Sequence, residues 1–263
     1  MAVCLTRSRD RADGWDPPSP AVAGLRRDRL YRIHTPTRPR WLRFFLGVAS
    51  IRNIIISSYM APNADLAVDS IEWYNLHAES VVDRHESIRA TDANAWLRKE
   101  LPKSPAFVLD VGAGSGRDAA WLKSLGHKVI AVEPCPEMAA HARRLGRCRD
   151  IEWIDDRLPE LAKVSARNSR FDFILANAMW MHLAPDERAP AIASLIGLLS
   201  PGGMLAIAFS QGTPQANGPF FECEGEEILD IALNEGAQLV KFRKRLPALM
   251  SPPSVQILLR QPN

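Results

Sequence analysis

Cysteine is scarce in this sequence of 263 residues, and its four cysteines form no Cys-x-x-Cys pair. Their scatter predicts neither a disulfide framework nor a zinc site, so the expected setting is reducing and cytoplasmic. No metal ion is expected either, because most of the histidines lack a partner at metal-ligand spacing. These histidines are His77, His85, His127 and His141.

Long hydrophobic runs free of charge are also missing. The most apolar stretch, WLRFFLGVASIRNIIISSYM, contains Arg43 and Arg52, which argue against a bilayer span. A basic amphipathic segment lying on a membrane surface stays open as an alternative. We therefore expect no transmembrane segment.

Lysine and glutamate are absent from residues 1–59, which contain 11 Arg and 4 Asp. That segment carries +7, and since the whole chain carries +3, residues 60–263 carry −4. The basic charge thus belongs to a Pro- and Arg-rich extension that we expect to be disordered, and it predicts no nucleic-acid partner for the rest. The change in composition suggests Met60 as the natural start of a single domain, with a helical lid at 60–104 and a Rossmann-like core at 105–263.

What the chain does contain is an alternation of short apolar runs and helical segments. Apolar positions at helical spacing predict one or two helices before Pro102. Seven runs then predict strands, at 106–111, 128–133, 151–154, 171–177, 204–210, 237–243 and 254–260. Five segments predict the helices between them, at 118–126, 136–146, 158–166, 186–200 and 224–236. This pattern is typical of an α/β, Rossmann-like, doubly wound sheet that is mostly parallel and ends in an antiparallel hairpin.

Glycine marks the expected ends of three of these helices, at Gly126, Gly146 and Gly236. Glycine adopts the left-handed conformation that often ends a helix. The helix that runs to Ser200 is expected to stop instead at the turn Pro201-Gly202-Gly203, because proline bars its continuation.

A glycine-rich loop joins a buried run to a helical segment in FVLDVGAGSGRD, residues 107–118. An acid, Glu133, ends the next predicted strand about twenty residues later, where it is suited to accept hydrogen bonds from ribose hydroxyls. Both a dinucleotide and S-adenosylmethionine fit these two features.

The glycine spacing and Asp110 favour S-adenosylmethionine. The glycines at 112, 114 and 116 form a GxGxG pattern, whereas pyrophosphate binding at a helix N-terminus uses GxGxxG. An ionised Asp110 would repel two phosphates but attract the sulfonium and ammonium groups of S-adenosylmethionine. We therefore expect the acid at the mouth of the loop to select a cation.

Further motifs follow in order along the chain: VLDVGAGSG, AVEP, IDDRLP, FDFILANAMWMHL and LSPGG. The series resembles the class I S-adenosylmethionine-dependent methyltransferases over roughly residues 70–260, and GSGRDA with WMHL resembles a bacterial, largely uncharacterised subgroup. The resemblance implies methyl transfer from S-adenosylmethionine (EC 2.1.1.-). The expected acceptor is an unidentified small molecule rather than DNA, because the (N/D/S)PPY sequence of amino-group methylation is absent after the fourth strand.

The resemblance also implies which residues bind the donor. The loop that approaches its methionyl part corresponds to Asp110, Gly112, Ala113, Gly114 and Gly116.

Single positions beyond the loop correspond to the rest of the donor. Glu133 matches the acid that accepts from both ribose hydroxyls, and Asp155 or Asp156 matches the acid that takes the adenine amino group. Asn177 matches the position that faces the sulfonium and the incoming nucleophile. Arg117 is a partner for the methionyl carboxylate by its charge and location alone.

His182 lies at the expected rim of the pocket and is the candidate for a general base, with a structural role as the alternative. Phe220 and Phe221 hint at an apolar acceptor. The expected lid contains Tyr74, Asn75, Arg84 and His85.

Two other functions stay open. One is an NAD(P)-binding Rossmann oxidoreductase, against which the GxGxG spacing, Asp110 and the terminal hairpin all count. The other is an S-adenosylmethionine-binding module without turnover, because the sequence shows binding residues but no acceptor chemistry. The sequence makes no prediction of oligomeric state.

Overall fold

The computed structural model describes residues 69–103, 105–211, 220–246 and 253–263. The basic extension at 1–59, the suggested start at Met60 and the first part of the expected lid lie outside these residues. Within the described ranges, no helix is both long enough and apolar enough to cross a bilayer.

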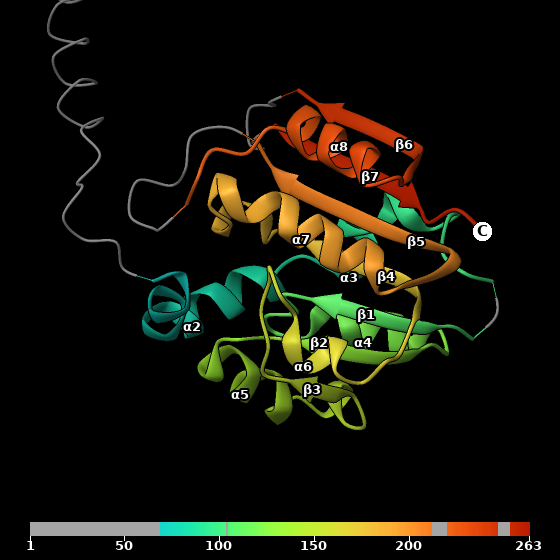
Figure 1. Cartoon of the computed structure of the whole chain (residues 1–263). Helices are drawn as coiled ribbons and strands as arrows, with labels where there is room; N and C mark the ends of the chain where they lie inside the picture. The colour runs from blue at the N-terminus through green and yellow to red at the C-terminus, as the bar shows by residue number, and fades with distance from the viewer. Residues whose placement is uncertain (1–68, 104, 212–219, 247–252) are drawn as a thin grey trace, which may run out of the picture. The chain divides into compact units, whose positions relative to one another are not determined.

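A seven-stranded sheet forms the centre of the domain, in the order β3-β2-β1-β4-β5-β7-β6. The first five strands run parallel, whereas β7 is antiparallel to both β5 and β6. The strands are β1 Phe107–Val111, β2 Lys128–Val132, β3 Glu152–Ile154, β4 Phe171–Asn177, β5 Leu199–Ser210, β6 Gln238–Arg245 and β7 Ser254–Arg260. The predicted Rossmann-like sheet with its closing antiparallel hairpin is confirmed, and Figure 1 shows β7 between β5 and β6.

The helices are α2 Ser70–Glu86, α3 Ala90–Ala93, α4 Arg117–Ser124, α5 Pro136–Arg144, α6 Ala162–Ser165, α7 Pro185–Gly197 and α8 Gly225–Asn234. Three single turns of 3₁₀-helix are η1 Ala95–Leu97, η2 Gly146–Cys148 and η3 Trp180–His182. The helix expected at 158–166 is shortened to the one turn of α6, because Leu161 has a left-handed backbone with φ 48°.

Two of the three predicted glycine stops are confirmed, and one is wrong. Gly126 and Gly236 have φ values of 91° and 87° after α4 and α8. Gly146 does not take the left-handed conformation. Leu145 ends α5 in an extended conformation, and Gly146 opens η2.

The strand expected at 204–210 begins earlier, at Leu199, and includes the turn residues Pro201 to Gly203. The chain bends there because Gly202 has φ 73°. The register with β4 shifts at the same place, from Phe171 opposite Leu199 to Phe173 opposite Met204. The proline and glycines therefore bend the first part of the strand instead of preceding it.

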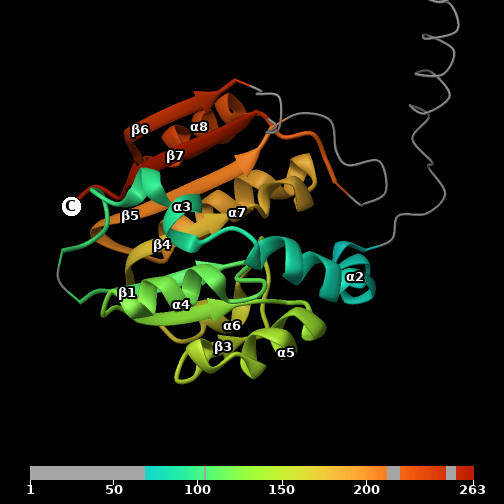
Figure 2. The same ribbon diagram turned by 180° about the vertical axis from the view of Figure 1, so that it is seen from behind.

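Helices cover both faces of the sheet because successive strand residues point to opposite sides. In β1, Leu109 and Val111 belong to a core cluster with residues of α6, α7 and α8. Val108 belongs instead to a second cluster with residues of η1, α4 and α5. Figures 1 and 2 show these two helical layers from opposite sides of the sheet.

The helix α2 lies beyond the ends to which the arrows of β1 and β5 point (Figures 1 and 2). It packs on α5 through a small apolar cluster that includes Ala78, Val81 and Met138. The carboxyl ends of the parallel strands, where ligands bind in open α/β sheets, are thus bordered by α2.

Candidate functional site

Three predicted site residues stand at the carboxyl ends of neighbouring parallel strands. Asp110 in β1 is in register with Ala131 of β2 and with Leu175 of β4. Glu133 follows β2 directly, and Asn177 is the last residue of β4. Because parallel strands end at the same edge, the sheet brings these three residues to one side of the domain.

Backbone hydrogen bonds hold the glycine loop against the end of β2. Gly112 and Ala113 both donate their N–H groups to the carbonyl of Val132, each at 2.9 Å. Gly114 donates to Glu133 Oε2 at 2.7 Å, and Cys135 donates to Glu133 Oε1 at 2.8 Å. The loop and Glu133 therefore form one unit, which the sequence spacing predicted without showing the bond.

The Glu133 carboxyl group is buried, and opposing effects act on its pKa. Burial raises its pKa to about 7, although the hydrogen bonds from Cys135 and Gly114 oppose the rise. Each of its oxygens accepts one hydrogen bond from the backbone, and a carboxylate offers about four acceptor positions. Two hydroxyl donors can therefore still bind to it.

The three glycines all have positive φ, but they leave room for different neighbours. A side chain at Gly116 would lie 2.8 Å from Cys148 Sγ and 3.0 Å from the Trp153 ring. At Gly112 it would lie 3.1 Å from Met179 Cβ. Glycine is thus required at position 116 because Cys148 and Trp153 pack closely there. It is required at position 112 because Met179, in the loop that follows β4, lies close to it.

Asp110 has a more buried setting than the sequence argument assumed. Complete burial raises its pKa well above the ordinary range, Asp118 raises it further, and Arg117 opposes the rise. The backbone N–H of Ala119, in the first turn of α4, hydrogen-bonds to this carboxyl group. Its environment therefore favours the protonated form, so the premise of an ionised Asp110 that selects a cation lacks structural support.

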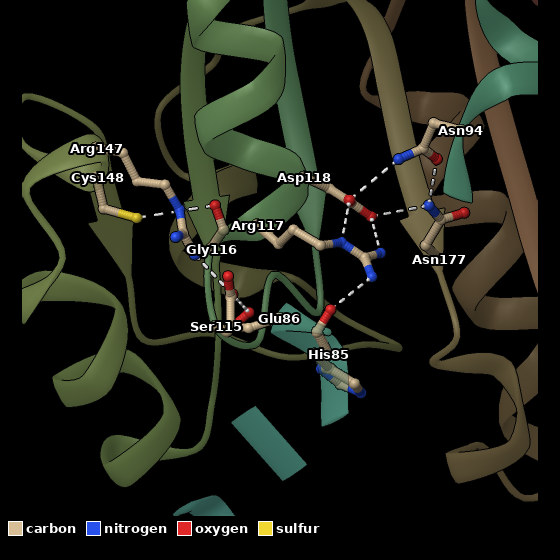
Figure 3. A network of polar contacts seen from close by, with 10 residues as sticks. All are labelled: His85, Glu86, Asn94, Ser115, Gly116, Arg117, Asp118, Arg147, Cys148 and Asn177. Carbon is tan, nitrogen blue, oxygen red and sulfur yellow. Dashed lines mark hydrogen bonds and ion pairs between the residues drawn. The ribbon is translucent and has the colours of Figure 1, made fainter. Parts of the chain in front are cut away.

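Asp118, the acid of the GSGRDA motif, is the centre of a buried polar network (Figure 3). Its Oδ1 accepts from Asn94 Nδ2 at 3.0 Å and from Arg117 Nε at 2.8 Å. Its Oδ2 accepts from Asn177 Nδ2 at 3.0 Å and from an Arg117 Nη at 3.1 Å. Asn177 Nδ2 also donates to Asn94 Oδ1 at 2.8 Å. The network therefore holds the Asn177 amide at the end of β4, through hydrogen bonds to Asn94, which follows α3, and to Asp118 in α4.

The guanidinium of Arg117 is occupied within the protein. It pairs with Asp118 through two nitrogens and donates to the backbone carbonyl of His85 at 3.1 Å, as Figure 3 shows. The structure therefore places Arg117 between α4 and the end of α2. These three bonds use three of the five N–H donors of the guanidinium, so a contact with the methionyl carboxylate would have to use the remaining two.

The end of α2 is tied to the glycine loop by Glu86. Its Oε1 accepts from Ser115 Oγ at 2.6 Å and pairs with Arg147 at 2.6 Å. The neighbouring His85 reaches over Gly114, since a side chain at Gly114 would lie 3.7 Å from His85 Nδ1. Burial and the charges of Arg117 and Arg84 lower the pKa of His85, which favours its neutral form.

The two acids after β3 have different surroundings. Asp156 accepts from the backbone N–H groups of Arg157 and Val164, at 3.0 and 2.9 Å, so it stabilises the start of α6. Asp155 is largely exposed and pairs with Lys163 at 3.1 Å. Both line an open pocket together with Ile71 and Pro134.

A second group of side chains joins α2 to the loop after β4. The Tyr74 hydroxyl lies 3.1 Å from His182 Nε2. Phe220 packs against His182 of this pair and against the neighbouring Trp73, with ring centroids 5.0 and 5.6 Å apart. The backbone N–H of Phe221 donates to the carbonyl of Met181 at 2.7 Å. Phe220 and Phe221 thus lie against the turn that contains Met181 and His182.

Several of these residues were not singled out from the sequence. Asp118 lay within a quoted motif, and its place one residue after Arg117 at a helix start was a usable signal. Asn94 and Trp73 come from the helices before β1, and no local pattern relates Asn94 to Asn177, which is 83 residues away. Only the fold brings them together.

Comparisons with known proteins agree with this geometry. Residues 108–203 match the family described as "Methyltransferase domain". A ubiquinone biosynthesis O-methyltransferase of Xanthomonas oryzae pv. oryzae is 31% identical over 122 residues, which cover 46% of this chain and 50% of that protein. The chain thus matches about half the length of this relative.

Solved structures share the fold. A TehB-like SAM-dependent methyltransferase from Corynebacterium glutamicum has a TM-score of 0.54 at 22% identity, over 71% of this chain and 98% of that one. The N-methyltransferase NodS from Bradyrhizobium japonicum has a TM-score of 0.53 at 18% identity, over 70% and 99%. Together with the sheet order, these findings show a segment similar to a methyltransferase domain at residues 108–203, within a fold shared with S-adenosylmethionine-dependent methyltransferases.

Proposed function

We propose that this chain transfers a methyl group from S-adenosylmethionine to a small-molecule acceptor. The observation that carries the proposal is the unit formed by Glu133 and Gly114, whose hydrogen bond of 2.7 Å joins the ribose-binding acid to the glycine loop. Displacement at a methyl group needs alignment more than a chemical group from the protein. Such positioning contributes roughly 7 to 11 kcal/mol to a rate enhancement.

The residues present fit the donor. Glu133 has acceptor positions left for two ribose hydroxyls, and the loop from Gly112 to Gly114 offers backbone without side chains at its glycines. Asp110 has one carboxyl oxygen without a hydrogen-bond partner, as expected for a group that meets a donor from outside the described residues. Asp155 is the better candidate for the adenine amino group, since Asp156 already caps α6.

The acceptor proposal has support of two kinds. The matched relatives include O-methyltransferases of ubiquinone biosynthesis, and NodS is an N-methyltransferase, so the proposal does not depend on one kind of acceptor atom. Our assignment of the chain to the GSGRDA and WMHL subgroup, and of α2 with its flanking residues to a lid, belongs to the same proposal.

Binding of the methyl donor to the full chain tests the proposal. Isothermal titration of the wild type with S-adenosylmethionine should give a saturable heat, and Glu133→Ala should weaken affinity by about 1 to 3 kcal/mol because two hydroxyls lose their acceptor. Glu152→Ala is the control, since this exposed acid pairs only with Arg167 in the described part of the chain. Stabilisation of the protein by NADPH and not by S-adenosylmethionine would favour the oxidoreductase. Binding of S-adenosylmethionine without any turnover would favour the non-catalytic module.

The two acids after β3 allow a sharper assignment in the same titration. Asp155→Ala should weaken binding by about 1 kcal/mol and leave stability unchanged, because its ion pair is exposed. Asp156→Ala should leave binding unchanged and lower stability by about 1 kcal/mol, because α6 loses the carboxylate that caps its start. The opposite pattern would move the adenine contact to Asp156.

A further inference from the structure

We propose that Tyr74 and His182 together remove the proton from an aromatic hydroxyl as its oxygen is methylated. The inference rests on the proposed methyl transfer and extends it to a class of acceptor. It starts from the contact between the Tyr74 hydroxyl and His182 Nε2, at 3.1 Å.

The position of the pair relates it to the donor side of the site. Tyr74 lies on α2, where burial, and after it the charge of Glu133, raise the pKa of the phenol. His182 ends η3, three residues after Met179, whose Cβ approaches Gly112. The pair therefore bridges from the end of β2 to the loop after β4, across the side of the sheet where the methionyl and ribose parts are proposed to bind.

The surroundings of the pair select the shape of the acceptor. Rings of Trp73 and Phe220 lie beside it, with interplanar angles of 69° to each other and of 45° between Phe220 and His182. The rings of Trp73 and Phe220 meet edge to face, and those of Phe220 and His182 are tilted. Aromatic surroundings of this kind favour a flat aromatic ring with a polar group at its edge. A hydroxyl on that ring would meet the Tyr74 oxygen.

The chemistry distinguishes a hydroxyl from an amine. A neutral amine attacks through its lone pair and loses a proton afterwards, whereas an aromatic hydroxyl of pKa about 10 is protonated at neutral pH and gains nucleophilicity by losing its proton. A base is therefore most useful for the hydroxyl.

The proposed step transfers one methyl group to the acceptor oxygen and one proton to His182. The acceptor oxygen forms a bond to the methyl carbon while the bond between that carbon and sulfur breaks, and sulfur keeps the electron pair. The acceptor proton passes to the Tyr74 oxygen as the proton of Tyr74 passes to His182 Nε2. The products are a methyl ether, a neutral thioether and an imidazolium. Since the pKa of Tyr74 is raised to about 12, Tyr74 passes the proton on without becoming a phenolate.

Other titratable groups face the pair and enter the pH dependence. Glu133 acts on Tyr74 from the end of β2, Cys135 from the start of α5, and Arg84 from α2 itself. Glu133 also titrates near neutral pH, at about 7, so it alone could give an acidic limb in a rate profile. A limb that belongs to Glu133 would persist when His182 is replaced.

The test uses the purified full chain with catechol and 1-naphthol as probes and aniline and 1-naphthylamine as matched amines. Release of S-adenosylhomocysteine is measured from pH 5.5 to pH 9. The hydroxyl probes should react at least about tenfold faster than their matched amines. Tyr74→Phe and His182→Gln should each lower kcat/KM for the hydroxyl probes by about 100-fold, the low end for a general base.

The pair acts as a unit in this proposal, so the double variant should lose no more than about threefold beyond either single variant. The part of the acidic limb that belongs to His182 should disappear in His182→Gln, while any part due to Glu133 persists and the Kd for S-adenosylmethionine stays within threefold of the wild type. His141→Gln, the same change on α5, is the matched control and should leave rates unchanged.

Several results would overturn the inference. They are S-adenosylmethionine binding without turnover of either hydroxyl probe, faster reaction of the amines, additive losses in the double variant, or an acidic limb whose midpoint and slope are unchanged in His182→Gln. Absence of S-adenosylmethionine binding by the wild type is a different result, because it would remove the proposed function itself.

Discussion

The proposed donor side and the proposed acceptor side of this site are built from different parts of the chain, one from backbone groups and the other from side chains. On the donor side, backbone N–H groups of Gly112, Ala113 and Gly114 are fixed by the end of β2 and by Glu133. On the proposed acceptor side, the central contact joins the side chains of Tyr74 and His182, which are 108 residues apart. A backbone-built half tolerates little change, whereas a half built from side chains can be altered without refolding the domain.

The same contrast appears in how the halves are connected. Asn94, Asp118 and Asn177 link the start of α4 to α3 and to the end of β4 through buried hydrogen bonds (Figure 3). This link lies between the two halves. Changes to it should cost less than a change to the loop and more than a change on the surface.

The largest expected effect is on the loop. Gly116→Val places a branched side chain where Cys148 Sγ and the Trp153 ring lie within 3.0 Å, at φ 75°. Overpacking and left-handed strain should together lower the free energy of unfolding by about 3 to 5 kcal/mol. Urea unfolding without ligand measures this loss.

Gly197→Val is the control for this change. Gly197 ends α7, and a side chain there meets no atom within 4 Å. The cost should stay below about 1 kcal/mol. Equal losses in both variants would show that the loop is not held as tightly as the backbone contacts indicate.

The next effect concerns pH and Glu133. The raised pKa, about 7 against an ordinary 4.5, means that the folded state binds this proton more tightly than the unfolded state. The free energy of unfolding should therefore fall as pH rises from about 4.5 to about 7, by at most about 3 kcal/mol from this group. The measurement is a series of urea unfolding curves across that range.

Glu133→Gln removes the titration and should flatten the fall. Asp110, whose pKa is also raised by burial, contributes in the same direction and remains in both proteins. The difference between the two series thus reports Glu133 alone. Parallel curves for the two proteins would contradict the buried, proton-retaining setting of this carboxyl.

The smallest of the three effects is in the link. Asp118→Asn keeps the size of the side chain but removes the charge that Arg117 pairs with, and it turns one acceptor into a donor facing donors. We expect a loss of about 1 to 2 kcal/mol in thermal or urea unfolding. Asp92→Asn, in an exposed pair with Arg89, should leave stability nearly unchanged because solvent screens the pair. If Asp118→Asn lowered stability no more than Asp92→Asn does, the network would not connect the two halves.

The donor half could be predicted from the sequence because its signals are local. The strand at 107–111, the glycines and the acid of Glu133 follow one another within one βαβ unit, so spacing alone indicates them. The same reasoning gave the order of helices and strands and the terminal hairpin. It failed at Gly146, where the helix ended one residue earlier in an extended conformation.

The acceptor half could be predicted only as a set of candidates. His182 and the aromatic residues near it have no periodic or spaced partner in the sequence, and Tyr74 reaches His182 only after α2 folds back over the strand ends. The ionisation of Asp110 was misjudged for a related reason. From a sequence motif alone, a carboxyl group is assumed to be ionised at neutral pH. The burial that raises the pKa of Asp110 arises only in the folded domain.

The position of β7 has a consequence for how the protein is made. This strand, Ser254–Arg260, supplies the partner for seven residues of β5 from inside the sheet. During synthesis the β5 edge therefore stays open until Ser254–Arg260 has left the ribosome. A messenger that ends before Ser254 would release a product with that apolar edge bare, and such products should aggregate or be degraded instead of accumulating as a smaller working protein.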